Sequence, residues 1–270
     1  MKIFDGRKEA DRILSDLKRK IKQRNISPRL AVILVGEDKP TLIYIKKKME
    51  AAEKIGARFS LFQFKRDVKE SGIVRKIHEL NKDKDVNGVL VQLPLPQGFK
   101  TGNITSRIDE KKDVDGFVSS YFSPVLPQAI LYILKKTKVD LKKKRIAALV
   151  NSDVFKEGLE DFFEKKGIKI NCFGCKDKSC FSKLKYFDII ISVCGKGKMI
   201  KKEIIKNNTI LIDAGFSYTK DGKVVGDIDK DSVKDKASFL TPVPGGVGPM
   251  TVAFIMKNLY LSTNKKYESK

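Results

Sequence analysis

Apolar and polar residues alternate in blocks along the chain, and the block lengths predict strands and helices in turn. An uninterrupted apolar run predicts a buried strand at residues 30–35, and largely apolar segments predict further strands at residues 57–64 and 86–91. Apolar residues at helical spacing predict helices at residues 5–25, 40–55 and 68–81. Such alternation implies parallel strands joined by helical crossovers, so the first part of the chain is expected to form an α/β domain.

A second alternation follows a predicted helix at residues 123–138. Strands are expected at residues 145–150, 168–173, 188–193 and 209–213, with a helix at 154–166. This is the pattern of a doubly wound, Rossmann-like dinucleotide-binding domain. The predicted organisation is a first α/β domain at residues 1–122, a dinucleotide-binding domain at 123–248, and a helix at 249–264 that packs back on the first domain. The charged residues 264–270 are expected to fray.

The stretch Thr241-Pro-Val-Pro-Gly-Gly-Val-Gly-Pro-Met-Thr251 is the most constrained part of the sequence. Its prolines fix φ, while its glycines permit left-handed conformations and close backbone approach. Pro249 stands where a proline begins a helix, and the apolar run after it predicts that helix. Since the free amides of a helix N-terminus suit a phosphate or carboxylate, the stretch is interpreted as a ligand-binding surface rather than an ordinary tight turn.

Three polar side chains on the predicted elements of the first domain are candidates for chemistry. Tyr44 and Lys48 are four residues apart on a predicted helix and therefore share a face. On its own this pair is more typical of a solvated, lysine-rich helix. Gln92 ends an apolar strand, where a buried amide is unfavourable unless it is hydrogen-bonded. It is expected either to bind a ligand at the carboxyl end of the sheet or to bond to a loop backbone.

The loop Lys112-Asp-Val-Asp-Gly116 carries two carboxylates. A calcium loop would need more oxygen ligands at longer spacing, so the pattern does not favour a metal. A single carboxylate that accepts hydrogen bonds from the amino and ring N–H groups of a heterocycle fits the loop better. An ordinary surface turn is the alternative.

Composition narrows the classes of function. The 270 residues are 41% hydrophobic, and no apolar run approaches membrane-spanning length. The N-terminus lacks the apolar segment of a secretion signal, so a cytoplasmic protein without a membrane partner is expected. The formal net charge is +23, but the lysines are spread along the chain without a zinc-finger or helix-turn-helix pattern. A solvated basic surface that attracts anionic small molecules is therefore favoured over nucleic-acid binding.

The cysteines and the single histidine offer little chemistry. Cys172 and Cys175 have a zinc-like local spacing, but no second matching pair follows them, so no metal site is expected. Reduced thiols are expected instead. His78 lies in a helical pattern and is interpreted as a surface residue, which leaves no histidine for catalysis.

Five motifs occur in order along nearly the whole chain. They are Val35-Gly36 followed by Thr41-x-x-Tyr44-x-x-x-Lys48, Gly88-Val-Leu-Val-Gln-Leu-Pro-Leu-Pro96, Lys112-Asp-Val-Asp-Gly116, Gly222-Lys-Val-Val-Gly-Asp227 and the stretch from Thr241 to Thr251. In these motifs the chain resembles the bifunctional methylenetetrahydrofolate dehydrogenase–methenyltetrahydrofolate cyclohydrolases. The resemblance implies a folate cleft between two α/β domains, usually in a homodimer. It also implies tetrahydrofolate as substrate and NADP as cofactor, with NAD left open and no metal.

The resemblance also implies roles for individual residues. Lys48 matches the general acid/base lysine, Tyr44 the tyrosine beside the substrate, and Gln92 the glutamine that holds and tunes the lysine. Asp115 matches the residue that binds the pterin. The implied substrate-binding residues are Tyr44, Gln92, Leu93, Pro94, Asp115, Pro244, Gly245, Gly246, Pro249 and Thr251. The implied cofactor-binding residues are Asn151, Ser152, Asp153, Gly158, Cys194, Gly195, Asp213 and Gly215.

The implied chemistry explains why these residue types are needed. Hydride loss from the methylene bridge leaves a delocalised cation, beside which a lysine is useful only if its pKa is low enough for the amine to be neutral. Hydrogen bonding by Gln92 and the nearby cation are both expected to favour that neutral form. The amine can then assist water attack and ring opening to the 10-formyl product.

The chain departs from the family pattern in its dinucleotide loop. Where the family has Gly-x-Ser-x-x-Val-Gly-x-Pro, this chain has Asn151-Ser-Asp-Val-Phe-Lys-Glu-Gly-Leu159. Carboxylates at Asp153 and Glu157 would oppose a pyrophosphate, and the lost glycines restrict the approach of the backbone to a ligand. A Pro-Cys-Thr-Pro segment of the family is also reduced to Pro124-Val-Leu-Pro127.

The expected function is the interconversion of 5,10-methylene-, 5,10-methenyl- and 10-formyl-tetrahydrofolate. One alternative is a monofunctional cyclohydrolase whose dehydrogenase activity is weak or lost through the altered loop. A second alternative is a non-enzymatic relic that binds folate or nucleic acid. The joint presence of Tyr44, Lys48, Gln92 and Asp115 argues against the relic.

Overall fold

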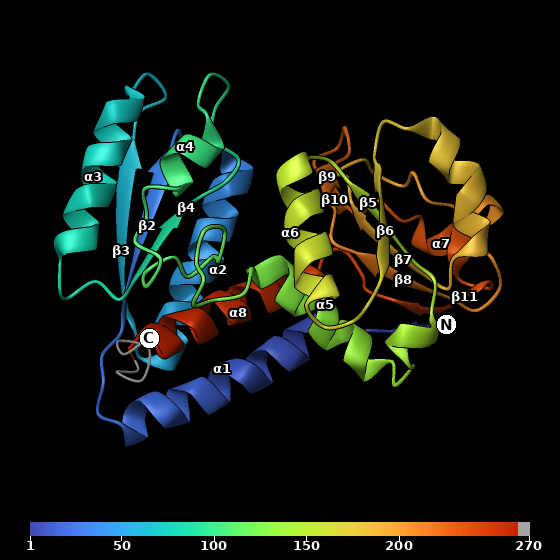
Figure 1. Cartoon of the computed structure of the whole chain (residues 1–270), viewed down its shortest axis with the longest axis horizontal. Coiled ribbons are helices and arrows are strands. Elements are labelled where there is room, and N and C mark those ends of the chain that lie inside the picture. Colours follow the sequence, from blue (N-terminus) through green and yellow to red (C-terminus); the bar gives the residue numbers. More distant parts are fainter. Residues whose placement is uncertain (264–270) are drawn as a thin grey trace. The chain divides into compact units, whose positions relative to one another are not determined.

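A computed structural model of the chain describes residues 1–263, apart from the side chains of residues 39, 40, 154 and 178. The predicted frayed tail 264–270 and the last residue of the predicted helix 249–264 lie outside this range. The chain divides into two compact units, and Figure 1 shows the elements of each. The six-strand unit comprises Met1–Glu9 and Leu126–Thr251. The three-strand unit comprises Ala10–Val125 and the described residues from Val252 onward.

The three-strand unit is built on a parallel sheet in the order β3-β2-β4. Its strands are β2 (Arg29–Val35), β3 (Arg58–Phe64) and β4 (Gly88–Val91). The helices that carry its residues are α1 (Gly6–Gln23), α2 (Lys39–Ile55), α3 (Glu70–Lys82), α4 (Thr101–Thr105) and α8 (Val247–Ser262). The first turn of α1 and the first residues of α8 belong to the six-strand unit.

The six-strand unit is built on a parallel sheet in the order β1-β11-β8-β7-β5-β6. Its strands are β1 (Lys2–Ile3), β5 (Ile146–Val150), β6 (Ile170–Gly174), β7 (Ile189–Val193), β8 (Thr209–Asp213) and β11 (Ala237–Leu240). Its α-helices are α5 (Val125–Lys136), α6 (Asp153–Glu164) and α7 (Lys230–Val233), and its short 3-10 helices are η1 (Leu141–Lys143), η2 (Lys178–Tyr186) and η3 (Lys202–Ile204). A small antiparallel hairpin joins β9 (Ser217–Tyr218) and β10 (Val224–Val225).

Local signals explain where several helices begin and end. Asp5 accepts a hydrogen bond from the amide of Lys8 at 3.0 Å and so caps α1, as expected. Gly56 ends α2 with φ +79°, the left-handed conformation that glycine adopts without steric penalty. Ser152 caps α6 by accepting a hydrogen bond from the amide of Phe155.

Each sheet is covered by apolar faces of its own helices. In the three-strand unit, alternate residues of β2 and β4 pack with α3 and α4 in one cluster: Ala31, Ile33, Val35, Val89 and Val91 with Ile73, Ile77, Leu80, Ile104 and Ile108. In the six-strand unit, strands β5, β7 and β8 pack against η2, η3 and α7 on one face, while α6 covers β5 and β6 (Figure 1). All five residues of β5, of β7 and of β8 are buried, which is why these strands read as continuous apolar runs.

The predicted α/β fold class is confirmed, and the structure adds elements that the apolar pattern did not indicate. The N-terminal strand β1 pairs in parallel with β11, so residues from the start and end of the chain share one sheet. Both strands are short, and β1 is exposed, so neither produces a clear apolar run. Helix α8 begins at Val247, two residues before the predicted start at Pro249.

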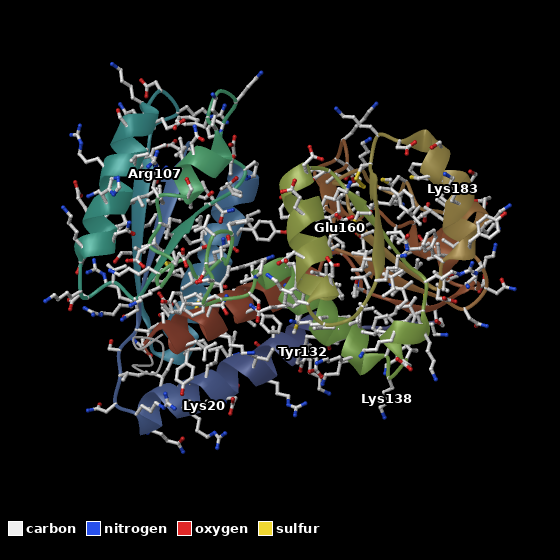
Figure 2. The ribbon with its side chains drawn as sticks, in the orientation of Figure 1. Lys20, Arg107, Tyr132, Lys138, Glu160 and Lys183 are labelled. Carbon is white, nitrogen blue, oxygen red and sulfur yellow. A yellow bond between two sulfur atoms is a disulfide. The ribbon has the colours of Figure 1, made fainter. Side chains whose placement is uncertain are left out.

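Basic side chains are distributed over both units. Figure 2 shows Arg107 beyond α4 in one unit and Lys138 and Lys183 in the other, and all three are exposed. None of the helices in residues 1–263 combines the length and apolar character that a membrane crossing needs.

Two glycines of the six-strand unit should respond oppositely to alanine. A Cβ on Gly6 would lie well inside contact distance of the Gly246 carbonyl, a backbone group that cannot rotate away. We expect Gly6→Ala to destabilise the protein by about 1–3 kcal/mol, because this clash outweighs the better helix propensity of alanine. Gly158 lies inside α6, and a Cβ added there would have no atom within 4 Å, so Gly158→Ala should stabilise by about 0.5–1 kcal/mol. Urea unfolding midpoints measure both changes, and a midpoint for Gly6→Ala at or above wild type would contradict the prediction.

Candidate active site

Helix α2 presents Tyr44 and Lys48 on one face, as the four-residue spacing predicts. Lys48 is buried, with only 7% of its surface exposed, while Tyr44 is half-buried. Neighbouring lysines behave differently: Lys46 is exposed, and the Lys47 ammonium lies 5.3 Å from the centre of the Tyr44 ring. Of these three adjacent lysines, Lys48 alone is withdrawn from solvent. The solvated-helix alternative is therefore wrong for Lys48.

Gln92 lies directly beyond the carboxyl end of β4 and contacts Lys48. Its backbone amide donates to the carbonyl of Ile33 at 2.8 Å, which holds the residue at the edge of the sheet. The side-chain Oε1 accepts a hydrogen bond from Lys48 Nζ at 2.6 Å, and Nε2 donates to the Leu93 carbonyl at 2.6 Å. The bond to Leu93 matches the expected loop-backbone partner. The oxygen of the same side-chain amide holds the Lys48 amine.

The electrostatics of this cluster couple Lys48 to Asp115. Burial lowers the pKa of Lys48 from 10.5 to about 8, although the negative charge of Asp115 acts against the lowering. Burial likewise raises the pKa of Asp115 to about 6, against the effect of Lys48 and with a contribution from Asp113. Gln92 itself does not lower the lysine pKa, contrary to the expectation. An oxygen that accepts a hydrogen bond favours the ammonium form, so the lowering comes from burial and Gln92 orients the amine.

The two carboxylates of the Lys112–Gly116 loop do different things. Asp113 is 1% exposed and accepts hydrogen bonds from the amides of Gly116, Val118 and Ser119 at 2.7–3.1 Å. It therefore fixes the shape of the loop. The side chain of Asp115 is not used in this way and is coupled to Lys48. The structure thus separates a loop-forming carboxylate from one that is available to a ligand.

Two supports of this loop were missed by sequence reasoning. Lys112 donates to the carbonyls of Leu80, Asn81 and Asp83, and so caps the C-terminal end of α3. Asn258 of α8 is 1% exposed and donates to the Val114 carbonyl at 2.9 Å. A polar residue inside the apolar pattern of α8 was the available signal for Asn258.

The constrained stretch from Thr241 to Thr251 belongs to the six-strand unit. Gly245 has φ +109°, a conformation that side-chain-bearing residues avoid. Gly246 is buried, and a Cβ there would lie 2.6 Å from the Pro242 carbonyl. Thr251 Oγ1 donates to the Gly248 carbonyl within α8 at 2.8 Å. Part of the glycine content thus serves tight packing, and a ligand-binding role of Pro244, Gly245, Gly246, Pro249 and Thr251 stays a prediction.

The predicted cofactor-binding residues lie at the carboxyl edge of the six-strand sheet. Asn151, Ser152 and Asp153 follow β5 and are exposed, and Cys194 and Gly195 follow β7. Gly158 has no close neighbour, so it does not bring α6 close to a strand. Asp213 is 2% exposed and accepts from the amides of Gly215, Asp227 and Ile228, and burial raises its pKa to about 7. Its carboxylate is thus occupied within the protein.

Comparisons with known proteins identify the family. Residues 4–115 match the family description "Tetrahydrofolate dehydrogenase/cyclohydrolase, catalytic domain", and residues 124–267 match "Tetrahydrofolate dehydrogenase/cyclohydrolase, NAD(P)-binding domain". The chain belongs to the tetrahydrofolate dehydrogenase/cyclohydrolase family. The resemblance drawn from the motifs is confirmed.

Relatives of this family member align over nearly their whole length. The chain is 36% identical to "Bifunctional protein FolD" of a Hydrogenobaculum species, covering 100% of both chains. It is 34% identical to the protein of the same name from Caldanaerobacter subterraneus, over 95% of this chain and 94% of the relative. The solved structure of the bifunctional enzyme FolD from Campylobacter jejuni has a TM-score of 0.91 at 31% identity, covering 98% of this chain and 99% of that one.

The cysteines require a correction of the sequence expectation. Cys175 and Cys194 form a disulfide with their Cα atoms 5.7 Å apart, while Cys172 and Cys180 are free. Spacing could not reveal this pair, because its members are 19 positions apart in sequence and follow different strands. Within residues 1–263, no three His, Cys, Asp or Glu side chains converge to hold a metal ion. Burial raises the pKa of Cys172 to about 12, so this thiol is a poor nucleophile.

The disulfide predicts the thiol content of this tetrahydrofolate dehydrogenase/cyclohydrolase family member. Protein purified without a reductant and then denatured should show two thiols per chain with an aromatic disulfide reagent, because only Cys172 and Cys180 are free. Prior reduction should raise the count to four. A Cys175→Ser variant is the matched control and should show three thiols without reduction. Four thiols in the unreduced wild-type protein would contradict the assignment.

Proposed function

We propose that this chain interconverts 5,10-methylene-, 5,10-methenyl- and 10-formyl-tetrahydrofolate, as a dehydrogenase and a cyclohydrolase. The observation that carries the proposal is the buried amine of Lys48, held 2.6 Å from Gln92 Oε1 and coupled to Asp115, with its pKa lowered to about 8. A lysine that is partly neutral near pH 8 can exchange protons with a substrate. The family assignment and the names of the aligned relatives support both activities over a monofunctional cyclohydrolase.

Lys48 is proposed as the general acid/base of the cyclohydrolase step. Its neutral Nζ takes a proton from the water that attacks the methenyl carbon, and its protonated form returns that proton to the ring nitrogen as its bond to the carbon breaks. The remaining hydroxyl proton is released to solvent as the formyl C=O forms, so the step yields one proton overall. Gln92 Oε1 accepts a hydrogen bond from one N–H of the amine and so orients the other N–H groups and the lone pair of Nζ. Because the methenyl substrate is itself cationic, its arrival lowers the lysine pKa further and increases the neutral fraction.

Asp115 is proposed to bind the pterin and Tyr44 to pack beside the substrate. A carboxylate matches the amino and ring N–H groups of a pterin, and the neighbouring Asp113 is already committed to the loop. Leu93 and Pro94, which follow Gln92, are proposed to line the same site. The substrate is also proposed to contact Pro244, Gly245, Gly246, Pro249 and Thr251.

The six-strand unit is proposed to bind NADP, which supplies the hydride acceptor when bound. The residues present fit such a ligand in two respects. The N-terminus of α6 follows β5 at the carboxyl edge of the sheet, where a doubly wound fold binds a pyrophosphate. Lys176 is exposed just beyond β6, where an acidic residue would favour NAD and a cation favours the additional phosphate of NADP. We further propose a homodimer, which the family resemblance supports, and a cytoplasmic location.

Replacing Lys48 should separate catalysis from substrate binding. Lys48→Ala should slow methenyltetrahydrofolate hydrolysis at least about 100-fold, because it removes the proton-transferring group, while folate affinity largely remains. The measurements are the hydrolysis rate, folate binding by calorimetry, and NADP-linked oxidation of methylenetetrahydrofolate, all on the same preparation.

Lys46→Ala is the matched control, because Lys46 lies on the same helix but is exposed. It should leave both activities within about twofold of wild type. Unchanged hydrolysis in Lys48→Ala would remove Lys48 from the mechanism. Hydrolysis without NADP- or NAD-linked oxidation in the wild-type protein would reduce the proposed function to the cyclohydrolase half.

The pH dependence should report the lysine directly. The hydrolysis kcat/KM should rise with pH through about 8 and then level off, because Lys48 is active when neutral and neutral above its pKa. Gln92→Glu places a negative charge beside the amine, raises its pKa and should move the midpoint to higher pH. The uncatalysed alkaline hydrolysis measured with Lys48→Ala is subtracted from each profile. A midpoint that Gln92→Glu leaves in place would contradict the assignment to Lys48.

A further inference from the structure

The order of the strands locates a ligand-binding edge in the six-strand unit. From β5 the chain crosses to β6 on one side, and from β6 it crosses to β7 on the other side of β5. Ligands of open α/β sheets bind outside the carboxyl ends of the strands at such a switch point. Val150 of β5 is in register with Val193 of β7, so the turn that begins at Cys194 lies beside the loop that begins at Asn151.

This turn, Cys194–Gly195–Lys196, is held by the carboxylate of Asp227, which is distant in sequence, in addition to the disulfide between Cys175 and Cys194. Asp227 Oδ2 accepts from the amide of Cys194 at 2.7 Å, and Oδ1 accepts from the amide of Lys196 at 2.6 Å. The Ser192 hydroxyl, on β7 itself, also donates to Oδ2 at 2.7 Å. Between the two amides, Gly195 has φ +69°, so the turn requires a left-handed residue.

The backbone of Asp227 is held in turn by the last residue of β8. Asp213, the last residue of β8, accepts from the amides of Asp227 at 3.2 Å and Ile228 at 2.9 Å. Two glycines make room for the carboxylates. A Cβ on Gly215 would overlap Asp227 Oδ2, and a Cβ on Gly226 would overlap Asp213 Oδ2.

Burying the two carboxylates of Asp227 and Asp213 costs more free energy than a purely structural contact would need. Asp227 is 0% and Asp213 2% exposed, and their donors in the described chain are backbone amides and one hydroxyl. Burying a carboxylate without a cation is unfavourable unless each oxygen is well hydrogen-bonded. An apolar contact would stabilise the sheet equally well, but it would not fix two amides of a turn at once.

We propose that Asp227 is a positioning residue of the dehydrogenase: it holds the Cys194–Lys196 turn in the shape that receives the nicotinamide dinucleotide. Ser192 and Asp213 support it. The inference rests on the proposed dehydrogenase function and concerns binding of the dinucleotide rather than the chemical step. Asp227 does not itself contact the dinucleotide.

The decisive variant is Asp227→Asn, which keeps the size of the side chain. An amide has one acceptor oxygen, so its NH2 group must face either the Lys196 amide or the pair formed by Ser192 and the Cys194 amide. The turn then loses at least one charge-assisted hydrogen bond. The KM for NADP⁺ should rise at least about tenfold with kcat within about threefold of wild type. Methenyltetrahydrofolate hydrolysis should stay within about twofold.

Asp188→Asn is the matched control. Asp188 also accepts from a backbone amide, that of Arg145 at 2.8 Å, but it precedes β7 at the opposite edge of the same sheet. Its replacement should leave the KM for NADP⁺ unchanged. Ser192→Ala removes one donor and no backbone bond, so it should fold normally and raise the KM about twofold to fivefold.

Calorimetric titration of each variant with NADP⁺ separates failure of this inference from failure of the proposed function. If the wild-type protein binds NADP⁺ but does not oxidise methylenetetrahydrofolate, the proposed dehydrogenase function is wrong. The inference is then tested by comparing the Kd for NADP⁺ of each variant with that of wild type. If the wild-type protein neither binds NADP⁺ nor oxidises methylenetetrahydrofolate, both the proposed dehydrogenase function and this inference are wrong. An unchanged KM or Kd in Asp227→Asn overturns the inference, as does an equal rise in Asp188→Asn or an equal loss of both activities. Should Asp227→Asn fail to fold, an unchanged KM in Ser192→Ala overturns it.

Discussion

The burial of one amine is the constraint on which the three-strand unit depends. Lowering the pKa of Lys48 from 10.5 to about 8 corresponds to about 3 kcal/mol of free energy against the ammonium form. Helix α2 must present the residue inward, β4 must end where Gln92 can accept its N–H, and the Asp115 loop must stay close enough to act electrostatically. Each requirement is met by a separate element. Register shifts in any of them would expose the amine and restore its ordinary pKa.

The sequence predicted the parts of this arrangement that are written in local spacing. Tyr44 and Lys48 follow from helical periodicity, and Gln92 follows from a polar residue at the end of an apolar strand. Which carboxylate of the Lys112–Gly116 loop is free could not be worked out from spacing, because it depends on which one turns toward the amides of Gly116, Val118 and Ser119. The family resemblance, rather than the pattern, singled out Asp115.

What could not be predicted is long-range. Asn258 reaches the carbonyl of Val114 across 144 positions of sequence, and Asp227 reaches the amides of the turn after β7 across more than 30. Strand β1 pairs with β11 from the far end of the chain. Contacts of this kind have no periodicity, so only a polar residue in an apolar context signals them. The disulfide between Cys175 and Cys194 belongs to the same class, because it joins the residues that follow β6 and β7, two strands on opposite sides of β5.

The altered loop after β5 is expected to weaken binding of the dinucleotide rather than abolish it. Asp153 occupies the first turn of α6, where a carboxylate stabilises the helix by about 0.3–1 kcal/mol but competes with a phosphate for the same dipole. Asp153 and Glu157 are exposed, and two unit charges 4 Å apart in water interact by only about 1 kcal/mol, which salt reduces further. A repulsion of that size weakens binding several-fold without abolishing it. The basic surface of the chain, with its net charge of +23, acts in the opposite direction on any anionic ligand. The proposed dinucleotide site, which relies on the turn at Cys194–Lys196, is therefore expected to tolerate the loss of glycines at Asn151 and Glu157.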